Sequence, residues 1–114
     1  MKTRYYLRLP EPALARGPDP TLAFRSVGAD GFAGEMQEAL RTTSLFLRWQ
    51  ATLEDPDDAD PSLAATDPDA TVTGTQSDLH VDLVATTSLP GAVFKQRLRL
   101  LAGSHWQLRD VTAG

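Results

Sequence analysis

The chain has no cysteine and only two histidines among its 114 residues. The absence of cysteine excludes disulfide frameworks, thiolate zinc sites and cysteine nucleophiles together. The sequence also contains no glycine-rich phosphate loop and no G-x-S-x-G nucleophile elbow, and its histidines, His80 and His105, are widely separated. We therefore expect no metal and no cofactor. Enzyme activity stays open, although the sequence favours a non-enzymatic protein.

Long hydrophobic runs are missing as well. Every apolar run is far shorter than the ~18 residues of a membrane span, and residues 1–17 lack the apolar core and cleavage site of a signal peptide. We therefore expect a cytoplasmic protein with no membrane partner, although export without a Sec signal would leave no trace in the sequence. Arginine outnumbers lysine nine to two, a bias typical of bacteria with GC-rich genomes.

The overall composition is that of a soluble globular protein, with 41% hydrophobic and 23% charged residues, and the length predicts one domain over residues 1–114. The net charge of −4 opposes non-specific attraction to phosphate backbones, so no nucleic-acid partner is expected. The charge is uneven, however. Residues 54–69 carry seven acids and no base, whereas residues 95–109 carry basic charges only.

The acidic segment, residues 54–70, contains three Asp-Pro pairs and almost no large apolar residue. This composition predicts a flexible surface loop. The oxygen-ligand positions of a calcium loop are partly matched by Asp58, Asp60, Ser62 and Asp69. Leu63 stands where a calcium loop requires glycine, so the sequence favours a solvated loop over a calcium site.

Hydrophobic periodicity predicts one main helix and several strands. Over residues 31–41, Phe32, Met36 and Leu40 recur at helical spacing. Alternation of apolar and polar residues predicts strands, which we place at 3–9, 21–27, 44–53, 71–76 and 79–87.

Residues 92–101 fit either a helix or a strand. A helix would gather Phe94, Leu98 and Leu101 on one side. A strand with turns on both sides would place Leu98 opposite Val81 and Leu100 opposite Trp106, so that apolar residues face one another throughout. This agreement favours the strand, and with it a C-terminal antiparallel meander that continues through residues 105–109.

The predicted fold class is α+β, with an antiparallel sheet of about 5–7 strands and the helix of residues 31–41 packed on one face. The alternative is a ferredoxin-like βαββαβ fold in which residues 91–102 form the second helix. The predicted core consists of Phe32, Met36, Leu40, Leu45, Leu47, Trp49, Val81, Leu83, Phe94, Leu98, Leu100, Trp106 and Leu108.

In the favoured register, basic side chains line up on the polar face of the sheet. Arginine forks bind phosphate or carboxylate, so this row is a candidate anion-binding site. It comprises His80, Arg97, Arg99 and Arg109. The competing interpretation is an ordinary solvated face with a cross-strand pair between Asp82 and Arg97. His80 and Asp82 have the spacing of a base and its orienting carboxylate, but no nucleophile stands beside them, so no catalytic residue is assigned.

These observations favour a small soluble bacterial protein that acts by binding another protein, through a sheet edge, the acidic segment or both. The alternative is a binder of small anionic ligands, or an enzyme, with a pocket between helix and sheet. Single-stranded nucleic acid needs stacking aromatic residues beside the positive charge, and the register places Trp106 on the buried face.

Overall fold

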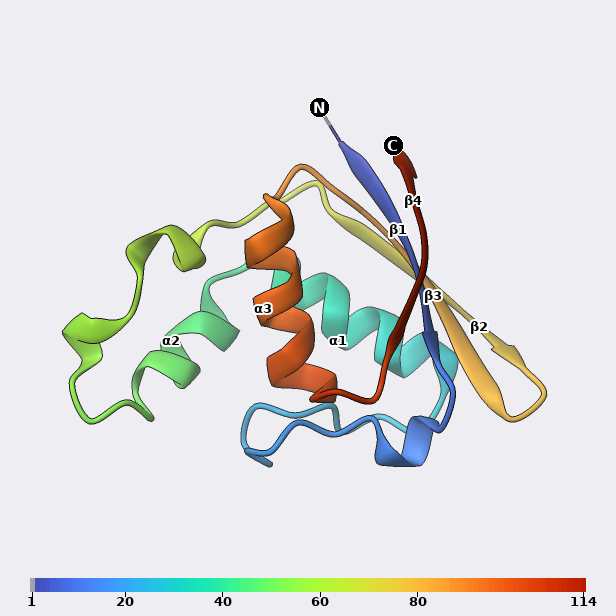
Figure 1. Ribbon diagram of the computed structural model, residues 1–114, viewed down its shortest axis with the longest axis horizontal. Helices are drawn as coiled ribbons and strands as arrows, with labels where there is room; N and C mark the ends of the chain where they lie inside the picture. Colours follow the sequence, from blue (N-terminus) through green and yellow to red (C-terminus); the bar gives the residue numbers. More distant parts are fainter. Residues whose placement is uncertain (1) are drawn as a thin grey trace.

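A computed structural model describes residues 2–114 and has an α+β architecture (Figure 1). Four antiparallel strands form one sheet, and three α-helices accompany it. In chain order the elements are β1 (Thr3–Leu9), α1 (Ala29–Arg41), α2 (Ser44–Gln50), β2 (Thr71–Ser77), β3 (His80–Thr87), α3 (Gly91–Ala102) and β4 (Gln107–Ala113). Short 3-10 turns are η1 (Pro12–Leu14), η2 (Pro56–Asp58) and η3 (Pro61–Ala64).

The strand order across the sheet is β2-β3-β1-β4. Since β3 is antiparallel to both β1 and β2, those two strands are parallel to each other and β3 lies between them. With α1 after β1 and α3 after β3, this is the βαββαβ order of the alternative prediction, extended by α2. The α+β class is confirmed. The expected 5–7 strands and single main helix are wrong, because the described residues form four strands and three helices.

The predicted C-terminal meander is wrong because residues 91–102 form α3. Pro90 precedes the helix, and Gly103 follows it with a φ of 64°, a left-handed conformation that favours glycine and ends the helix. Phe94 and Leu98 are buried at helical spacing, and the Phe94 ring stacks on Tyr5 of β1 with 4.0 Å between ring centroids. Strand β3 therefore pairs with β1 instead of residues 92–101.

Two further predicted strands are absent from the described residues. Residues 44–50 form α2, which buries the consecutive residues Leu45 and Phe46 and leaves Leu47 55% exposed. Residues 21–27 contain no regular element. Phe24 is nevertheless buried: its ring lies edge-on to Phe32, and its N–H donates to the Leu101 carbonyl at the end of α3.

The hairpin of β2 and β3 confirms two predicted strands with a register shifted by two residues. A two-residue turn at Ser77 and Asp78, as the sequence predicts, would set Val72 opposite Leu83, whereas Val72 pairs with Ala85 and Leu83 faces Gly74. The turn comprises Asp78 and Leu79. A shift of two residues preserves which side chains point to the core, because side-chain direction alternates with period two.

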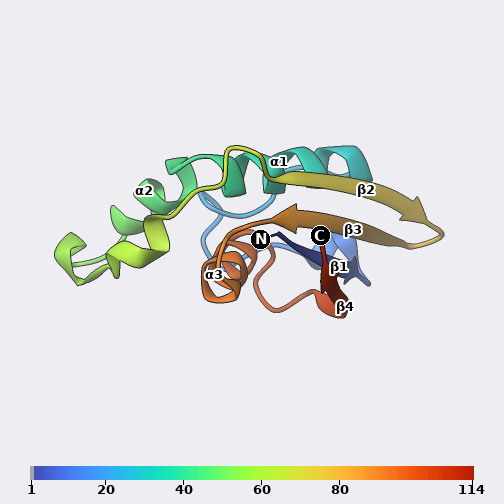
Figure 2. The same ribbon diagram turned by 90° about the horizontal axis from the view of Figure 1, so that it is seen from above.

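The core lies between the sheet and the helices, and Figure 2 shows α1 alongside β2 with α3 on the other flank. Eight predicted core residues are buried: Phe32, Met36, Leu40, Leu45, Val81, Leu83, Phe94 and Leu98. Trp49, Leu100 and Trp106 are partly buried against them. Leu47 and Leu108 are exposed, so their assignment to the core is wrong.

The acidic segment is attached to the core at its carboxyl-terminal end. Arg97 of α3, fully buried, donates to the carbonyl oxygens of Leu63 and Ala65, both at 2.8 Å. Asp67 is 5% exposed and accepts hydrogen bonds from the Thr87 hydroxyl at 2.9 Å and the Ser88 N–H at 2.8 Å. The flexibility of residues 54–70 stays a prediction, with these contacts marking where the segment is held.

Helix α1 covers the outer edge of β2. The N–H of Val72 donates to Gln37 Oε1 at 3.0 Å, and the Ala70 carbonyl accepts from Arg41 Nε at 2.6 Å. A Cβ at Gly74 would lie 2.4 Å from the Ala29 carbonyl oxygen, so only glycine permits this approach. The outward Val72 N–H is therefore occupied, and α1 shields the edge of β2 at Gly74.

We expect Gly74→Ala to lower the free energy of unfolding by about 1–2 kcal/mol, because the new methyl group must push backbone of α1 away. Gly34→Ala is the matched control. Gly34 lies inside α1, and a Cβ there meets nothing within 4 Å, so this change should stabilise by about 0.5–1 kcal/mol. Urea denaturation measures both. A neutral Gly74→Ala would contradict close packing of α1 on β2.

Candidate functional site

Strand β4 forms the other edge of the sheet, and all seven of its residues are exposed. Leu108 pairs with Leu7, and Val111 pairs with Tyr5. Leu7 and Tyr5 point into the core, so Leu108 and Val111 also point to the helix side. They are 41% and 46% exposed. The helices thus leave the helix side of the edge strand β4 uncovered.

A β-bulge interrupts the pairing of β4 with β1. Tyr6 pairs with Asp110 and Leu7 pairs with Leu108, so Arg109 is the extra residue. The bulge explains how Leu108 and Val111, three positions apart, lie on the same side of the sheet.

Within residues 2–114, the outer backbone edge of β4 has no strand beside it. The Gly114 N–H donates to the Lys2 carbonyl at 2.9 Å and therefore points toward β1. Because backbone direction alternates along a strand, the N–H of Val111 points outward. It donates to the side chain of its neighbour Asp110, at 2.9 Å from Oδ1. The outward Val111 N–H of β4 is therefore hydrogen-bonded only to the exposed Asp110 carboxylate, and an acceptor from another chain can replace that carboxylate.

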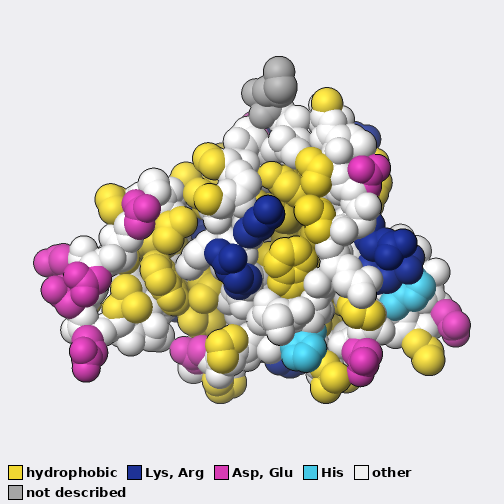
Figure 3. Space-filling model, in the orientation of Figure 1, with side chains coloured by type: hydrophobic (Ala, Val, Ile, Leu, Met, Phe, Trp, Pro, Cys, Tyr) yellow, Lys and Arg dark blue, Asp and Glu magenta, His cyan; other side chains and the backbone are white. Residues whose placement is uncertain are grey.

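Beside β4, apolar side chains continue across the surface toward α3. Leu100 and Trp106 are partly buried next to the core, and Trp106 Nε1 donates to the Gly103 carbonyl at 3.0 Å. Figure 3 shows hydrophobic side chains surrounding two basic side chains near the centre of this face of the molecule. Lys95 and Arg99 are the exposed basic residues of α3. The surface beside the edge strand is thus apolar with positive charge nearby.

The four residues of the candidate anion site are distributed over three elements. His80 begins β3, Arg97 and Arg99 belong to α3, and Arg109 lies on β4. Arg97 is 0% exposed and donates to three backbone carbonyls, whereas Arg99 and Arg109 are exposed. The prediction that these four residues share one face of the sheet is wrong, because Arg97 and Arg99 belong to a helix.

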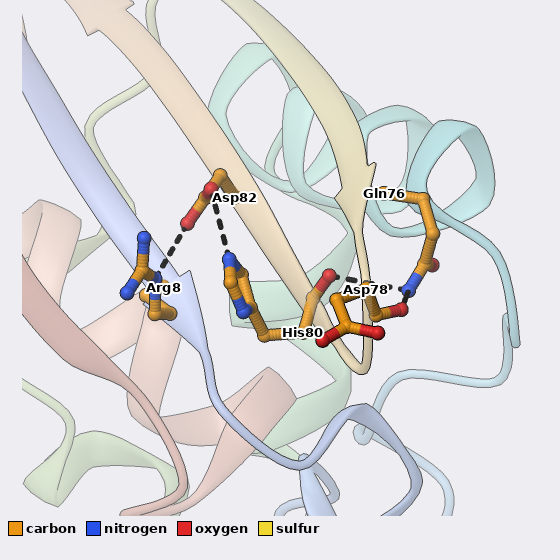
Figure 4. Close-up of polar contacts among 5 residues, drawn as sticks. All are labelled: Arg8, Gln76, Asp78, His80 and Asp82. Carbon is orange, nitrogen blue, oxygen red and sulfur yellow. Dashed lines mark hydrogen bonds and ion pairs between the residues drawn. The ribbon is translucent and has the colours of Figure 1, made fainter.

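On the open face of the sheet, Asp82 lies between two basic side chains (Figure 4). Arg8 Nε donates to Asp82 Oδ1 at 2.9 Å, and His80 Nε2 lies 3.3 Å from Asp82 Oδ2. The His80 contact satisfies the distance of an ion pair but lacks the alignment of a hydrogen bond. The expected pair between Asp82 and Arg97 is wrong, since Arg8 of β1 takes that place through the pairing of β1 with β3.

The hydrogen bond from Arg8 is the main cause that holds the pKa of the Asp82 carboxyl below its usual value. Partial burial opposes this effect, and the positive charge of Arg8 and the contact with His80 add to it. The cluster neutralises much of its own charge. Its side chains are only 26–34% exposed, so it presents limited surface to a ligand.

Two surface depressions accompany these sites. One, at the end of α3, is lined by Arg16, Pro18, Arg99, Gly103, Ser104 and His105. The Arg16 guanidinium is occupied, because it donates to the Ser26 carbonyl and lies over the Phe32 ring. The second, about 180 Å³, lies between α1, α2 and residues 22–25, and Glu35, Glu38 and Arg48 contribute mixed charge. Neither lies between a helix and the sheet.

Within residues 2–114, no three His, Asp or Glu side chains converge as a metal site requires. No helix in this part of the chain has the length and apolarity needed to cross a membrane. The chain matches no protein-family model, no curated protein and no solved structure. The functional argument therefore depends on the geometry of the described residues.

Sequence reasoning named a sheet edge as one candidate binding surface but did not say which edge. The strand predicted at residues 105–109 is confirmed in part, because β4 extends from Gln107 to Ala113. The missed signal is the spacing of Leu108 and Val111. Two apolar residues spaced three positions apart break the alternation of a regular strand. Together with the charged residues Arg109 and Asp110 between them, this spacing indicates a bulge.

Proposed function

We propose that this protein binds another protein chain by accepting an extended strand along the outer edge of β4. The observation that carries this proposal is that β4 is exposed on its outer backbone edge and on its helix side together. Strand addition uses both features: backbone hydrogen bonds supply affinity, and alternate side chains supply specificity.

The contrast between the two sheet edges supports this choice. Gln37 and the backbone of Ala29 occupy or shield β2 at Val72 and Gly74, as native proteins commonly do with an edge that must not pair. In the described part of the chain, nothing covers β4 in the same way. Leu108 and Val111 offer apolar contacts to every second residue of an added strand, and the outward Val111 N–H offers a donor.

A selection for bound peptides tests this proposal even though the partner is unidentified. We expect random peptides of about twelve residues, selected on the immobilised chain, to protect the amides of Val111 and Ala113 from hydrogen exchange. Val111→Pro removes the outward N–H and should weaken the selected peptides at least tenfold, since proline at an edge leaves the pairing with β1 intact.

Val111→Thr is the matched control, because it keeps the N–H and nearly the same shape. It should weaken binding by less than about threefold, the cost of one exposed methyl group. Thermal unfolding checks that both variants fold. Peptides that bind Val111→Pro as tightly as the unchanged chain, or that protect amides elsewhere only, would contradict strand addition at β4.

A further inference from the structure

Building on the proposed function, we infer that the strand added to β4 is β4 of a second copy of this chain. Two copies related by a twofold axis would join their sheets edge to edge, with the two β4 strands antiparallel. The outer edge is free of other strands in the described residues, and its exposed side chains are self-complementary in one register.

In that register, Leu108 of each copy lies opposite Val111 of the other. Both side chains point to the helix side, as antiparallel partners must. Leu108 and Val111 pair with Leu7 and Tyr5, which lie two apart on β1, so their outward backbone groups point the same way. Each Val111 N–H can then donate to a Leu108 carbonyl of the second copy, and the reciprocal pair forms by symmetry.

Charge complementarity singles out the same register. Between the two apolar pairs, Arg109 of each copy lies opposite Asp110 of the other, so two opposite-charge pairs form. Within the described residues, Arg109 forms no salt bridge, and the Asp110 carboxylate is held only by the neighbouring Val111 N–H. On pairing, Asp110 would release that N–H to the partner backbone and turn to the arginine.

The neighbouring registers are disfavoured by the same residues. A shift of one residue in one direction places the Arg109 side chains of the two copies opposite each other. A shift in the other direction does the same with the two Asp110 side chains. Identical charges directly opposite each other destabilise a strand pair. Charged residues and a bulge on an edge strand usually block pairing with arbitrary strands. Here they would disfavour strands that lack a complementary charge pattern and would admit β4 itself.

The bulge makes this register possible. In a regular strand, residues three apart point to opposite faces, so Leu108 could not meet Val111 across an antiparallel pair. The extra residue Arg109 brings both to the helix side in each copy. In this register residues 107–112 of the two strands face each other, a contact at the small end of specific interfaces, so we expect a dissociation constant on the order of 10–100 μM.

Sedimentation velocity over about 1 μM to 1 mM tests the inference with reciprocal charge reversals. Arg109→Asp and Asp110→Arg should each weaken dimerisation at least tenfold, because each creates two like-charge pairs per dimer. The double variant Arg109→Asp/Asp110→Arg restores both pairs and should dimerise within about threefold of the unchanged chain. Both positions are exposed on β4, and thermal unfolding checks that each variant retains the fold.

Mixing the two single variants provides the sharpest readout. Two acidic side chains on one copy then face two basic side chains on the other, so a heterodimer should form although neither variant pairs with itself. A chain that stays monomeric to about 1 mM would overturn the inference. A dimer unaffected by the single reversals would overturn it as well, because that dimer uses another surface.

Failure of self-pairing and failure of strand addition give different results. If the chain is monomeric while Val111→Pro still abolishes binding of the selected peptides, β4 accepts strands but not its own copy. If the chain is monomeric and Val111→Pro leaves peptide binding unchanged, both proposals fail.

Discussion

Replacing Arg97 by methionine is expected to lower the free energy of unfolding by about 3–5 kcal/mol. The Arg97 side chain is fully buried, and the described residues place no carboxylate against it. Its guanidinium donates to the carbonyls of Ala39, Leu63 and Ala65. Methionine fills much of the same volume but donates nothing, so three carbonyl oxygens lose their partner at once.

The location of these carbonyls explains why a buried cation is tolerated. Ala39 lies in the last turn of α1, where unsatisfied carbonyls carry partial negative charge that favours a cation. Leu63 and Ala65 belong to η3 and its end. Burial lowers the pKa of Arg97, yet arginine stays charged in proteins. Arg97 thus ties the acidic segment to α1 and α3.

Arg99→Met is the matched control, since Arg99 lies two residues along the same helix and is exposed. It should change the free energy of unfolding by no more than about 0.5 kcal/mol. Urea denaturation measures both variants, and hydrogen exchange should show faster exchange around residues 63–65 in Arg97→Met. Equal stability of the two variants would show that the carbonyl contacts of Arg97 contribute nothing.

Arg97 also shows why the sequence misled the assignment of residues 92–101. In a strand, Lys95, Arg97 and Arg99 share one face and the leucines share the other, which looks like a half-buried strand. In α3, one of these arginines points inward because backbone carbonyls are there to receive it. A rule that places arginine on the surface cannot foresee carbonyls supplied by α1 and η3, which are distant in sequence.

Non-local pairing accounts for the other errors. Residues 3–9 read correctly as a strand from alternation alone, but nothing local shows that β1 lies between β3 and β4. Once β1 occupies the centre, Asp82 meets Arg8, and residues 92–101 have no edge of β3 left to join. Helix α1 was predictable because its apolar spacing is local. The packing of α1 on the edge of β2, in contrast, depends on contacts between segments distant in sequence, such as Gln37 with Val72.

The sequence could suggest a sheet edge as a candidate binding surface, but it could not show which edge is exposed. Composition and the lack of catalytic motifs favoured a partner-binding protein, and two sheet edges follow from any open sheet. Which edge is free depends on where α1 and α3 lie, and that is a property of the packed structure. The charge pattern of Arg109 and Asp110 became informative only when the bulge placed them at the free edge.

The second large effect is expected from Asp67→Asn, which should lower the free energy of unfolding at neutral pH by about 2–3 kcal/mol. The Asp67 carboxylate is buried, and its Oδ2 accepts from the Thr87 hydroxyl and the Ser88 N–H. Its Oδ1 accepts from the Asp69 N–H at 3.1 Å. An asparagine has one acceptor oxygen, so in either orientation its NH₂ group faces a backbone N–H that loses its acceptor.

The pH dependence of this effect follows from the ionisation of Asp67. Burial alone would raise the pKa of the carboxyl, but the hydrogen bonds from Ser88, Thr87 and Asp69 together hold the pKa below its usual value. The folded state therefore binds the proton less readily than the unfolded state. The stabilisation is complete above the unfolded pKa of about 4 and is lost as the pH falls through the lower folded pKa.

The difference in stability between the unchanged chain and Asp67→Asn should consequently be largest above about pH 5 and narrow below about pH 4. Taking this difference removes the acid effects that both chains share. Asp69→Asn serves as the control, because Asp69 is exposed in the same segment, and its difference should stay within about 0.5 kcal/mol at every pH. Urea denaturation between pH 3 and pH 7 measures all three chains. A difference for Asp67→Asn that is constant with pH would show that the ionised carboxylate is not what holds this segment to the turn before α3.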